Sequence, residues 1–255
     1  MPAMLVLNAA GPASAERVTD PGGLAARILD EARGLTSPED CAPLDSLTRQ
    51  LRGLDPAAIV GDQARIAFWL DLYNALLLHQ LCLSPVRGSI LRQLRLFSRV
   101  AYEVGGAPYS LNAIEHGLLR ANRRPPYHPR AVLRRSDPRL RAAPSRRDPR
   151  VHFALNCGAR SCPPVRVYTA AELDSQLELA TRAYLQAESR VDAARRQVWL
   201  PRLMRLYRAD YGDREAQLDF AARHLPELAE QRAAAGRLTV RYGRFDWAAA
   251  PGRGG

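Results

Sequence analysis

The sequence predicts an α+β fold that is mainly helical and has a small, mostly antiparallel sheet. Apolar residues recur at helical spacing along several segments, most clearly from Asp62 to Leu83. Two short apolar runs flank Gly105-Gly106, as the arms of a β-hairpin do. Two further short runs, 197–200 and 238–245, contain the β-branched and aromatic residues typical of strands, and we expect them to pair.

The amino-terminal part is expected to be helical. Residues from Pro21 to about Leu54 show two amphipathic helices, and Asp45 is placed to cap the second. In the helix from Asp62 to Leu83, Asp71 and Asn74 lie on one stripe within an apolar surface. A buried carboxylate and a buried amide each need hydrogen-bond partners. These two side chains therefore either tie the helix to a loop or belong to a functional site.

A basic helix around Ile90 to Phe97 is expected next, followed by a hairpin of residues 100–104 and 107–111. Pro108 makes the second arm an edge strand, because proline cannot donate to a sheet.

Asn112 to Glu115 has the pattern of a capping box, in which Asn112 caps a helix and Glu115 reaches back to its start. The helix that begins there carries His116 and Arg120 one turn apart on the same side. Glu115 is thus either a capping carboxylate or a chemical group, and both interpretations stay open.

The stretch 148–163 is the part of the chain richest in reactive side chains. Its apolar portion predicts a short buried strand over 151–156, after which glycine permits a sharp turn. Cys157 lies at this turn, and Cys162 follows just before two prolines. A strand that ends in a tight turn presents side chains rigidly, so the two thiols and His152 are candidate functional groups.

The remainder is expected to be mainly helical. A capping box at Thr169 to Glu172 predicts a helix that runs to about Glu188. Helices around 203–208 and 214–235 follow, with Gly236 as a helix stop.

Length and composition predict one domain. The chain has 255 residues, of which 47% are hydrophobic and 25% are charged, so it can bury one substantial core. We found no repeat and no linker, and we predict a single domain over residues 21–247. Residues 1–20 are expected to be a disordered tail or the remnant of a signal peptide, and 248–255 a second disordered tail.

No apolar run approaches the roughly 18 residues needed to cross a bilayer, so no transmembrane segment is expected. The ending Ala13-Ser14-Ala15 resembles a signal-peptidase site without the usual positive leading region. If the true start lies upstream, we expect an exported or periplasmic protein, and otherwise a cytoplasmic one.

The net charge of +11 is carried entirely by arginine, because the chain has no lysine. Enzyme classes that need a Schiff-base, P-loop or kinase-type lysine are therefore excluded. Ten arginines lie between Arg123 and Arg150, in a segment without periodicity that should be a surface loop. It lacks an aromatic platform, so we expect only weak, non-specific contact with nucleic acid.

Four motifs, in this order, resemble the DUF547 family, a domain of unknown function. They are Phe68-Trp69-Leu70-Asp71-Leu72-Tyr73-Asn74-Ala75, Ile114-Glu115-His116-Gly117-Leu118-Leu119-Arg120, the run from Arg150 to Pro163, and Arg241-Tyr242-Gly243-Arg244-Phe245-Asp246-Trp247. The resemblance covers residues 45–247 and implies a shared fold unit but no reaction. The chain departs from the family at Asp71, where Asn is usual, and from Ala248 onward. Bacterial members are often small and exported, while plant members carry the domain beside a coiled coil.

The first functional hypothesis is a cysteine-dependent hydrolase or acyltransferase. Cys157 is the expected nucleophile, because a thiolate at a strand end can reach a cleft. His116 or His152 would be the base, with Glu115 or Asn74 orienting it. Backbone N–H groups near the glycine turn would form an oxyanion hole. On an ideal strand His152 and Cys157 point to opposite faces, which favours His116.

Two alternatives stay open. One is a zinc site made by His116, His152, Cys157 and Cys162. The other is a binding or scaffold module in which the cysteines are structural, as core thiols or as a Cys157–Cys162 disulfide. No cofactor is expected, and the partner could be a small molecule, a peptide or a protein. Five residues are assigned to ligand binding: His152, Asn156, Cys162, Arg120 and Arg150.

Overall fold

The structure is a computed structural model, and it describes residues 4–12, 18–235 and 237–250. These residues form two compact units, each described here by itself. The first takes in the described residues within 1–148, 155–174 and 247–255, and the second residues 149–154 and 175–246. The single domain over 21–247 stays a prediction, because two compact units in one chain can still fold as one domain.

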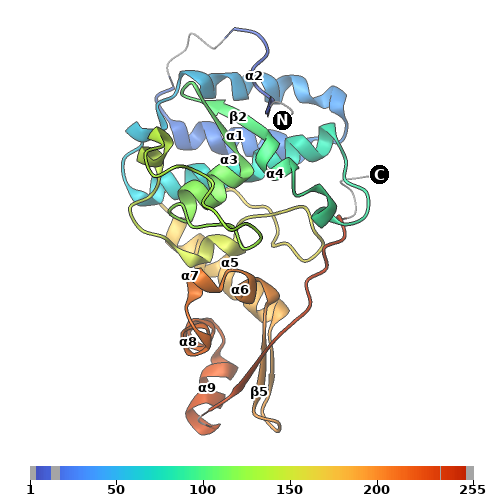
Figure 1. The fold of residues 1–255 in the computed structure, drawn as a ribbon, viewed down its shortest axis with the longest axis vertical. Coiled ribbons are helices and arrows are strands. Elements are labelled where there is room, and N and C mark those ends of the chain that lie inside the picture. Colours follow the sequence, from blue (N-terminus) through green and yellow to red (C-terminus); the bar gives the residue numbers. More distant parts are fainter. Residues whose placement is uncertain (1–3, 13–17, 236, 251–255) are drawn as a thin grey trace. The chain divides into compact units, whose positions relative to one another are not determined.

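The first unit is built around α3 (Asp62–Leu83), which begins and ends as predicted. Its side chains are buried from Ile66 to Leu81 on every face, so it is a central core helix. It is long and apolar enough to cross a membrane, but 89% of its most apolar window is buried within the structure. The amphipathic α1 (Pro21–Gly34) packs along α3 and buries a stripe that includes Leu24 and Ile28 (Figure 1).

The second predicted helix is α2 (Ala42–Gln50), and its start differs from the prediction. Cys41 occupies the cap position and Asp45 lies inside the first turn, so the predicted cap at Asp45 is wrong. A preceding 3-10 turn, η1 (Pro38–Cys41), moves the start upstream because Pro38 sets its first residue. Two more 3-10 turns, η2 (Leu51–Gly53) and η3 (Pro56–Ala58), lead from α2 to α3.

The hairpin prediction is confirmed. β2 (Val100–Val104) and β3 (Ala107–Ser110) pair antiparallel across Gly105-Gly106, whose φ angles of 57° and 77° favour glycine. β1 (Leu5–Val6) adds to β2 in parallel. The described part of the predicted amino-terminal tail is therefore ordered here, while residues 1–3 and 13–17 lie outside the described residues.

The predicted basic helix around Ile90 to Phe97 is interrupted. It consists of a 3-10 turn, η4 (Ile90–Gln93), and a single α-helical turn, α4 (Leu96–Arg99). Only Ile90 and Phe97 are buried in these two turns, which is too few contacts to hold a longer helix in place.

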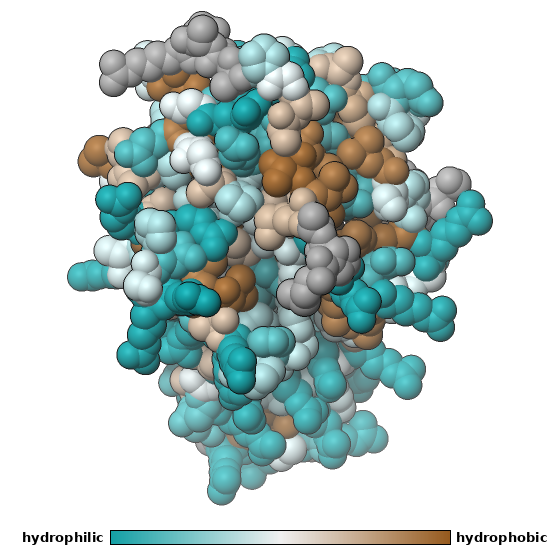
Figure 2. Space-filling model, turned by 45° about the horizontal axis from the view of Figure 1, so that its top comes forward, coloured by the Kyte–Doolittle hydropathy of each residue, from teal (hydrophilic) through white to brown (hydrophobic). Residues whose placement is uncertain are grey.

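The arginine-rich segment is an irregular loop with one 3-10 turn, η6 (Pro138–Ala142). It is tied to α3, because Trp69 Nε1 donates to the Ala142 carbonyl over 2.9 Å and the Asp62 carboxylate accepts from the Ser145 backbone N–H over 2.7 Å. Hydrophilic side chains project around much of the surface shown in Figure 2 and surround smaller apolar patches.

The described residues of the second unit form a mixed sheet and five α-helices. Its strands are β4 (Arg190–Asp192), β5 (Gln197–Leu200) and β6 (Thr239–Tyr242). β5 pairs antiparallel with β4 and parallel with β6, which confirms the predicted pairing of the two carboxy-terminal runs. The helices are α5 (Leu173–Glu188), α6 (Arg202–Leu206), α7 (Arg208–Tyr211), α8 (Arg214–His224) and α9 (Pro226–Ala235) (Figure 1).

Two boundaries in this region differ from the predictions. α5 begins at Leu173, after a turn formed by the predicted capping residues. The predicted helix 214–235 is broken before Pro226, which lacks the N–H that a continuous helix would need. Gly236, the predicted stop, lies outside the described residues.

The predicted strand 151–156 is wrong. Residues Pro149–Phe153 form a 3-10 helix, η7, and the Ala154 N–H donates to the Val151 carbonyl over 3.0 Å. Proline at the first position fixes a helical φ and starts the turn. Val151 and Phe153 are still buried, so their apolar side chains indicate that the segment is buried but not that it is a strand. The argument that His152 and Cys157 point to opposite strand faces therefore does not apply.

The fold class is confirmed as α+β and mainly helical. In the described part of the chain its strands form two three-stranded sheets, and each sheet has one parallel and one antiparallel pair. The sheets are small, as predicted, and differ in one detail from a mostly antiparallel sheet, because each also contains a parallel pair.

Candidate functional site

Two polar side chains of α3 hold a loop, residues 155–168, that we call the thiol loop because it carries Cys157 and Cys162. Asn74 Oδ1 accepts from the Asn156 backbone N–H over 3.0 Å, and Asp71 Oδ1 accepts from the Tyr168 backbone N–H over 3.0 Å. Asn74 and Asp71 are fully buried. Both side chains thus tie α3 to a loop, which is one of the two roles that the sequence left open for them.

The thiol loop also closes on itself. Asn156 Nδ2 donates to the Pro163 carbonyl and Asn156 Oδ1 accepts from the Gly158 N–H, both over 2.7 Å. Gly158 has a φ of 85°, which a residue with a side chain rarely adopts. Asn156 therefore fixes the shape of the turn that carries Cys157.

An extended carboxy-terminal segment, residues 247–250, crosses the thiol loop. The Arg160 N–H donates to the Ala248 carbonyl and the Ala250 N–H donates to the Gly158 carbonyl, both over 2.9 Å. Ala248 to Ala250 were predicted to belong to a disordered tail, but here they are hydrogen-bonded like a short strand. Residues 251–255, the rest of that predicted tail, lie outside the described residues.

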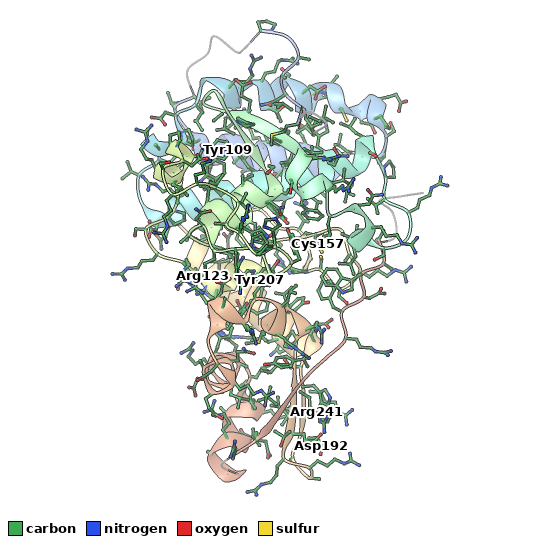
Figure 3. All side chains as sticks on the ribbon, viewed as in Figure 1. Tyr109, Arg123, Cys157, Asp192, Tyr207 and Arg241 are labelled. Carbon is green, nitrogen blue, oxygen red and sulfur yellow. The ribbon has the colours of Figure 1, made fainter. Side chains whose placement is uncertain are left out.

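Cys157 and Cys162 are both free and partly exposed thiols at the turn (Figure 3 labels Cys157). The Cys157 backbone N–H donates to the Cys162 sulfur over 3.0 Å. The Cys162 N–H donates to the Ala159 carbonyl over 3.1 Å and closes the turn. The Cys162 sulfur is thus surrounded by backbone donors of the preceding residues.

The two thiols have opposite pKa shifts. The hydrogen bond that Cys157 donates to Cys162 raises the Cys157 pKa well above its usual range, and burial raises it further. Burial also acts to raise the pKa of Cys162. It is outweighed by hydrogen bonds from the Cys157 thiol and from the N–H groups of residues 157, 159 and 158, which lower the pKa. The hydrogen bonds to its sulfur therefore favour the ionised form of Cys162 over that of Cys157.

Glu115 lies in the interior near this pair. The segment that carries it, η5 (Ala113–Leu119), is a π-helix, and Glu115 is 5% exposed. Its Oε2 accepts from Tyr73 OH over 3.2 Å, and its charge contributes to the raised pKa of Cys157. π-helical turns are often found at functional sites.

The predicted capping box at Asn112 is wrong. Asn112 makes no side-chain cap, and its Nδ2 donates to Ser98 Oγ over 2.7 Å instead. Ser110 Oγ accepts from the Ala113 N–H over 3.3 Å and provides the cap. Glu115 turns inward to Tyr73, so it does not act as a capping carboxylate.

His116 is fully buried and held on both sides of its ring. Tyr127 OH donates to Asn112 Oδ1 over 2.7 Å, so it can accept from His116 Nε2, which lies 3.2 Å away. Arg120 Nη1 lies 2.8 Å from His116 Nδ1 and can only donate. Glu115 Oε1 also lies 3.5 Å from His116 Nδ1, so both ring nitrogens are already engaged. This arrangement does not suit a base for a thiol.

The other two predicted binding residues, His152 and Arg150, belong to the second unit. His152 Nε2 lies 2.9 Å from Asp210 Oδ2, and its ring stacks on Tyr207 with centroids 3.9 Å apart. Arg150 Nη1 lies 3.9 Å from Glu178 Oε2. Both side chains take part in the packing of their own unit.

Sequence reasoning did not select Tyr73 or Tyr127, although each contacts a candidate residue. Tyr73 is one position from Asn74, within a helix whose sequence is apolar almost throughout. Tyr127 lies in the arginine-rich loop, where no periodicity indicates that its hydroxyl is turned inward. The ring of a tyrosine is apolar and its hydroxyl is polar, so the sequence alone does not distinguish a tyrosine that packs in the core from one whose hydroxyl contacts a functional group.

A cavity of about 750 Å³ opens elsewhere in the first unit, beside the start of α1. Asp20, Asp55 and Tyr168 are among its lining residues, and neither thiol lines it. Within residues 4–12, 18–235 and 237–250, no three His, Cys, Asp or Glu side chains are arranged to hold a metal ion.

A family model described as "Protein of unknown function, DUF547" matches residues 59–185. The matched region contains α3, η5 and the thiol loop, and so includes Asn74, Glu115, His116 and both thiols. A comparison with curated proteins and a comparison with solved structures each found no match.

Proposed function

The chain belongs to the DUF547 family, and we propose that it is a cysteine-dependent enzyme that hydrolyses or transfers acyl groups. The observation that carries this proposal is the 3.0 Å hydrogen bond from the Cys157 backbone N–H to the Cys162 sulfur. The thiolate is the nucleophilic form of cysteine, and hydrogen bonds to a charged group favour its ionised form. We therefore assign the nucleophile to Cys162 and not to Cys157, the residue favoured by the sequence.

In the proposed reaction the Cys162 thiolate attacks the carbonyl carbon of an ester, a thioester or an amide. A carbon–sulfur bond forms, the bond to the leaving group breaks, and the Cys157 thiol gives its proton to the leaving group. Water or an acceptor molecule then attacks the thioester and returns a proton to the Cys157 sulfur, and the Cys162 thiolate is released. The pair carries one negative charge throughout.

Two further residues support this chemistry. Glu115 is proposed to keep Cys157 protonated, because its negative charge raises the pKa of that thiol. Asn74 is proposed to position the thiol loop through Asn156. The role of His116 as a base stays a prediction. The contacts of its ring with Arg120 and Tyr127 argue against that role.

Alkylation with iodoacetamide at a series of pH values tests the proposal directly. Trypsin separates the two thiols, because it cleaves after Arg160 and yields peptides 151–160 and 161–166. Cys162 should react as a thiolate at lower pH than a free cysteine, whose pKa is about 8.5, and Cys157 at higher pH. Cys162→Ser should also abolish turnover of a p-nitrophenyl ester, while Cys82→Ser should not. Equal alkylation profiles, or turnover by Cys162→Ser, would reject the assignment.

Thiol–disulfide exchange is a second candidate, favoured by two free thiols in one turn, where the backbone N–H of Cys157 donates to the sulfur of Cys162. Cys162 would attack a substrate disulfide, and Cys157 would then displace the product from the mixed disulfide. Cys157→Ser separates the two functions. A serine hydroxyl can still pass a proton to an acyl leaving group, so ester turnover should persist at a reduced rate. Serine cannot resolve a mixed disulfide, so exchange would stop with the substrate bound to Cys162.

A further inference from the structure

The two remaining cysteines form a second pair in the first unit. Cys41 is the last residue of η1, and Cys82 lies near the end of α3, against which η1 packs. Their thiols are close enough for each to affect the pKa of the other, and both are free. The two residues are 41 positions apart in the sequence, so the pair connects the amino-terminal helices to the central helix.

The surroundings of this pair differ from those of the thiol loop. Burial, the neighbouring Cys82 and the carboxylates of Asp45 and Asp40 together raise the pKa of Cys41 to about 11. Burial also raises the pKa of Cys82. The nearby charges are negative and oppose a thiolate. The pair is therefore poorly suited to nucleophilic catalysis.

We propose that Cys41 and Cys82 are a structural disulfide pair, which closes when the protein meets a disulfide oxidant such as oxidised glutathione. One cysteine sulfur attacks the oxidant and releases one reduced glutathione, leaving a mixed disulfide. The second cysteine sulfur then displaces the other glutathione and forms the Cys41–Cys82 bond. The two thiol protons end on the two glutathione molecules, so two cysteines are oxidised and one glutathione disulfide is reduced.

The pKa values of the two cysteine pairs predict disulfides that differ in how easily thiols reduce them. A thiol of high pKa is a poor leaving group, so a Cys41–Cys82 bond should resist reduction by thiols. A Cys157–Cys162 bond should be more easily reduced, because Cys162 leaves as a stabilised thiolate. Closing the longer loop should also stabilise the fold more, because it restricts more of the unfolded chain.

Peptide mapping distinguishes the pairs without any variant. The protein is equilibrated in glutathione buffers of increasing oxidised fraction, blocked with N-ethylmaleimide and cleaved with trypsin. Cys41 then lies in peptide 34–49 and Cys82 in peptide 66–87, whereas the other pair lies in peptides 151–160 and 161–166. We expect 34–49 to be linked to 66–87, and this link to survive reducing buffers that open the other pair.

The apparent melting temperature provides a second measurement. Oxidation should raise it by on the order of 10 °C, and Cys41→Ser or Cys82→Ser should remove this increase. The Cys157→Ser, Cys162→Ser double variant should retain it and serves as the matched control. Unlinked peptides 34–49 and 66–87 in fully oxidising buffer would overturn the proposal. Because the peptides differ, that result would leave the assignment of Cys162 unaffected.

Discussion

Asn74 accepts a hydrogen bond from the backbone of Asn156 over 3.0 Å, and this bond joins the central core helix α3 to the thiol loop. Asp71, three residues earlier on α3, holds the backbone of Tyr168 in the same way. Residues three apart on a helix lie on the same side, so one face of α3 secures both ends of the loop. The rigid helix therefore sets the position of the two thiols.

Asn74→Leu should weaken both the fold and the site. Leucine has a similar volume but no acceptor, so the buried N–H of Asn156 loses a partner at a cost of about 1 to 3 kcal/mol. The free energy of unfolding, measured with urea, should fall by that amount. The alkylation rate of Cys162 at neutral pH should fall as well, because the loop is no longer held in shape.

Asn122→Ala is the matched control, because Asn122 secures a different loop through two hydrogen bonds to the Leu133 backbone, of 2.9 and 3.1 Å. It should lower stability and leave the reactivity of Cys162 unchanged. If Asn74→Leu lowers stability but Cys162 reacts as in the wild type, the positioning role of Asn74 is wrong.

Gly158→Ala should slow the reaction of Cys162 with iodoacetamide. The φ of 85° at Gly158 is strained for alanine by about 1 to 2 kcal/mol, and the added Cβ would lie 3.1 Å from Leu81 and 3.2 Å from Ile90. The backbone should shift and move donors away from the sulfur. Gly106→Ala, in the β2–β3 turn at a φ of 77° with no atom within 4 Å of the new Cβ, controls for strain alone. Equal rates in the two variants would contradict this prediction.

The arginine-rich loop should bind nucleic acid only weakly. Arg130, Arg134 and Arg135 are exposed, whereas Arg139 is held by Asp137 over 2.8 Å. Replacing the three exposed arginines with glutamine should reduce the salt dependence of binding to a DNA duplex, measured by fluorescence anisotropy. A complex that persists at high salt would show that the loop makes specific contacts.

The helix that carries Asn74 could be predicted because its pattern is local. Twenty-two residues without proline or glycine form one apolar helix, and two polar residues inside it require partners. The hairpin at Gly105-Gly106 is local for the same reason. These elements depend on backbone preferences that a short window of sequence contains.

The thiol pair could be located from the sequence, but the roles of its members could not. A five-residue apolar run is compatible with a strand or a buried helical turn, and proline at 149 selects the turn. The pKa of Cys162 depends on which backbone N–H groups point at its sulfur. The orientation of these N–H groups depends on the φ of Gly158, on the side chain of Asn156 and on the carboxy-terminal segment. That segment lies far from the thiol loop in the sequence.

Asp71→Asn should stabilise the protein increasingly as the pH rises from about 4 to 8. Burial raises the pKa of Asp71 from 3.8 to about 8, and its Oδ2 has no hydrogen-bond partner among the described residues. Between these pH values the folded protein binds a proton that the unfolded chain has released. The contribution of protonated Asp71 to the free energy of unfolding is therefore fully present below pH 3.8 and is lost as the pH rises through 8.

Asparagine removes this titration and keeps an acceptor for the Tyr168 N–H. The variant should exceed the wild type by about 1 to 3 kcal/mol at pH 8 and by much less at pH 4, in urea unfolding at both pH values. Asp62→Asn should show the opposite slope, because hydrogen bonds from Ser145 lower the pKa of Asp62 and its stabilisation is lost as the pH falls. If the difference between Asp71→Asn and the wild type does not change with pH, Asp71 is ionised in the folded protein and the proposed buried neutral acid is wrong.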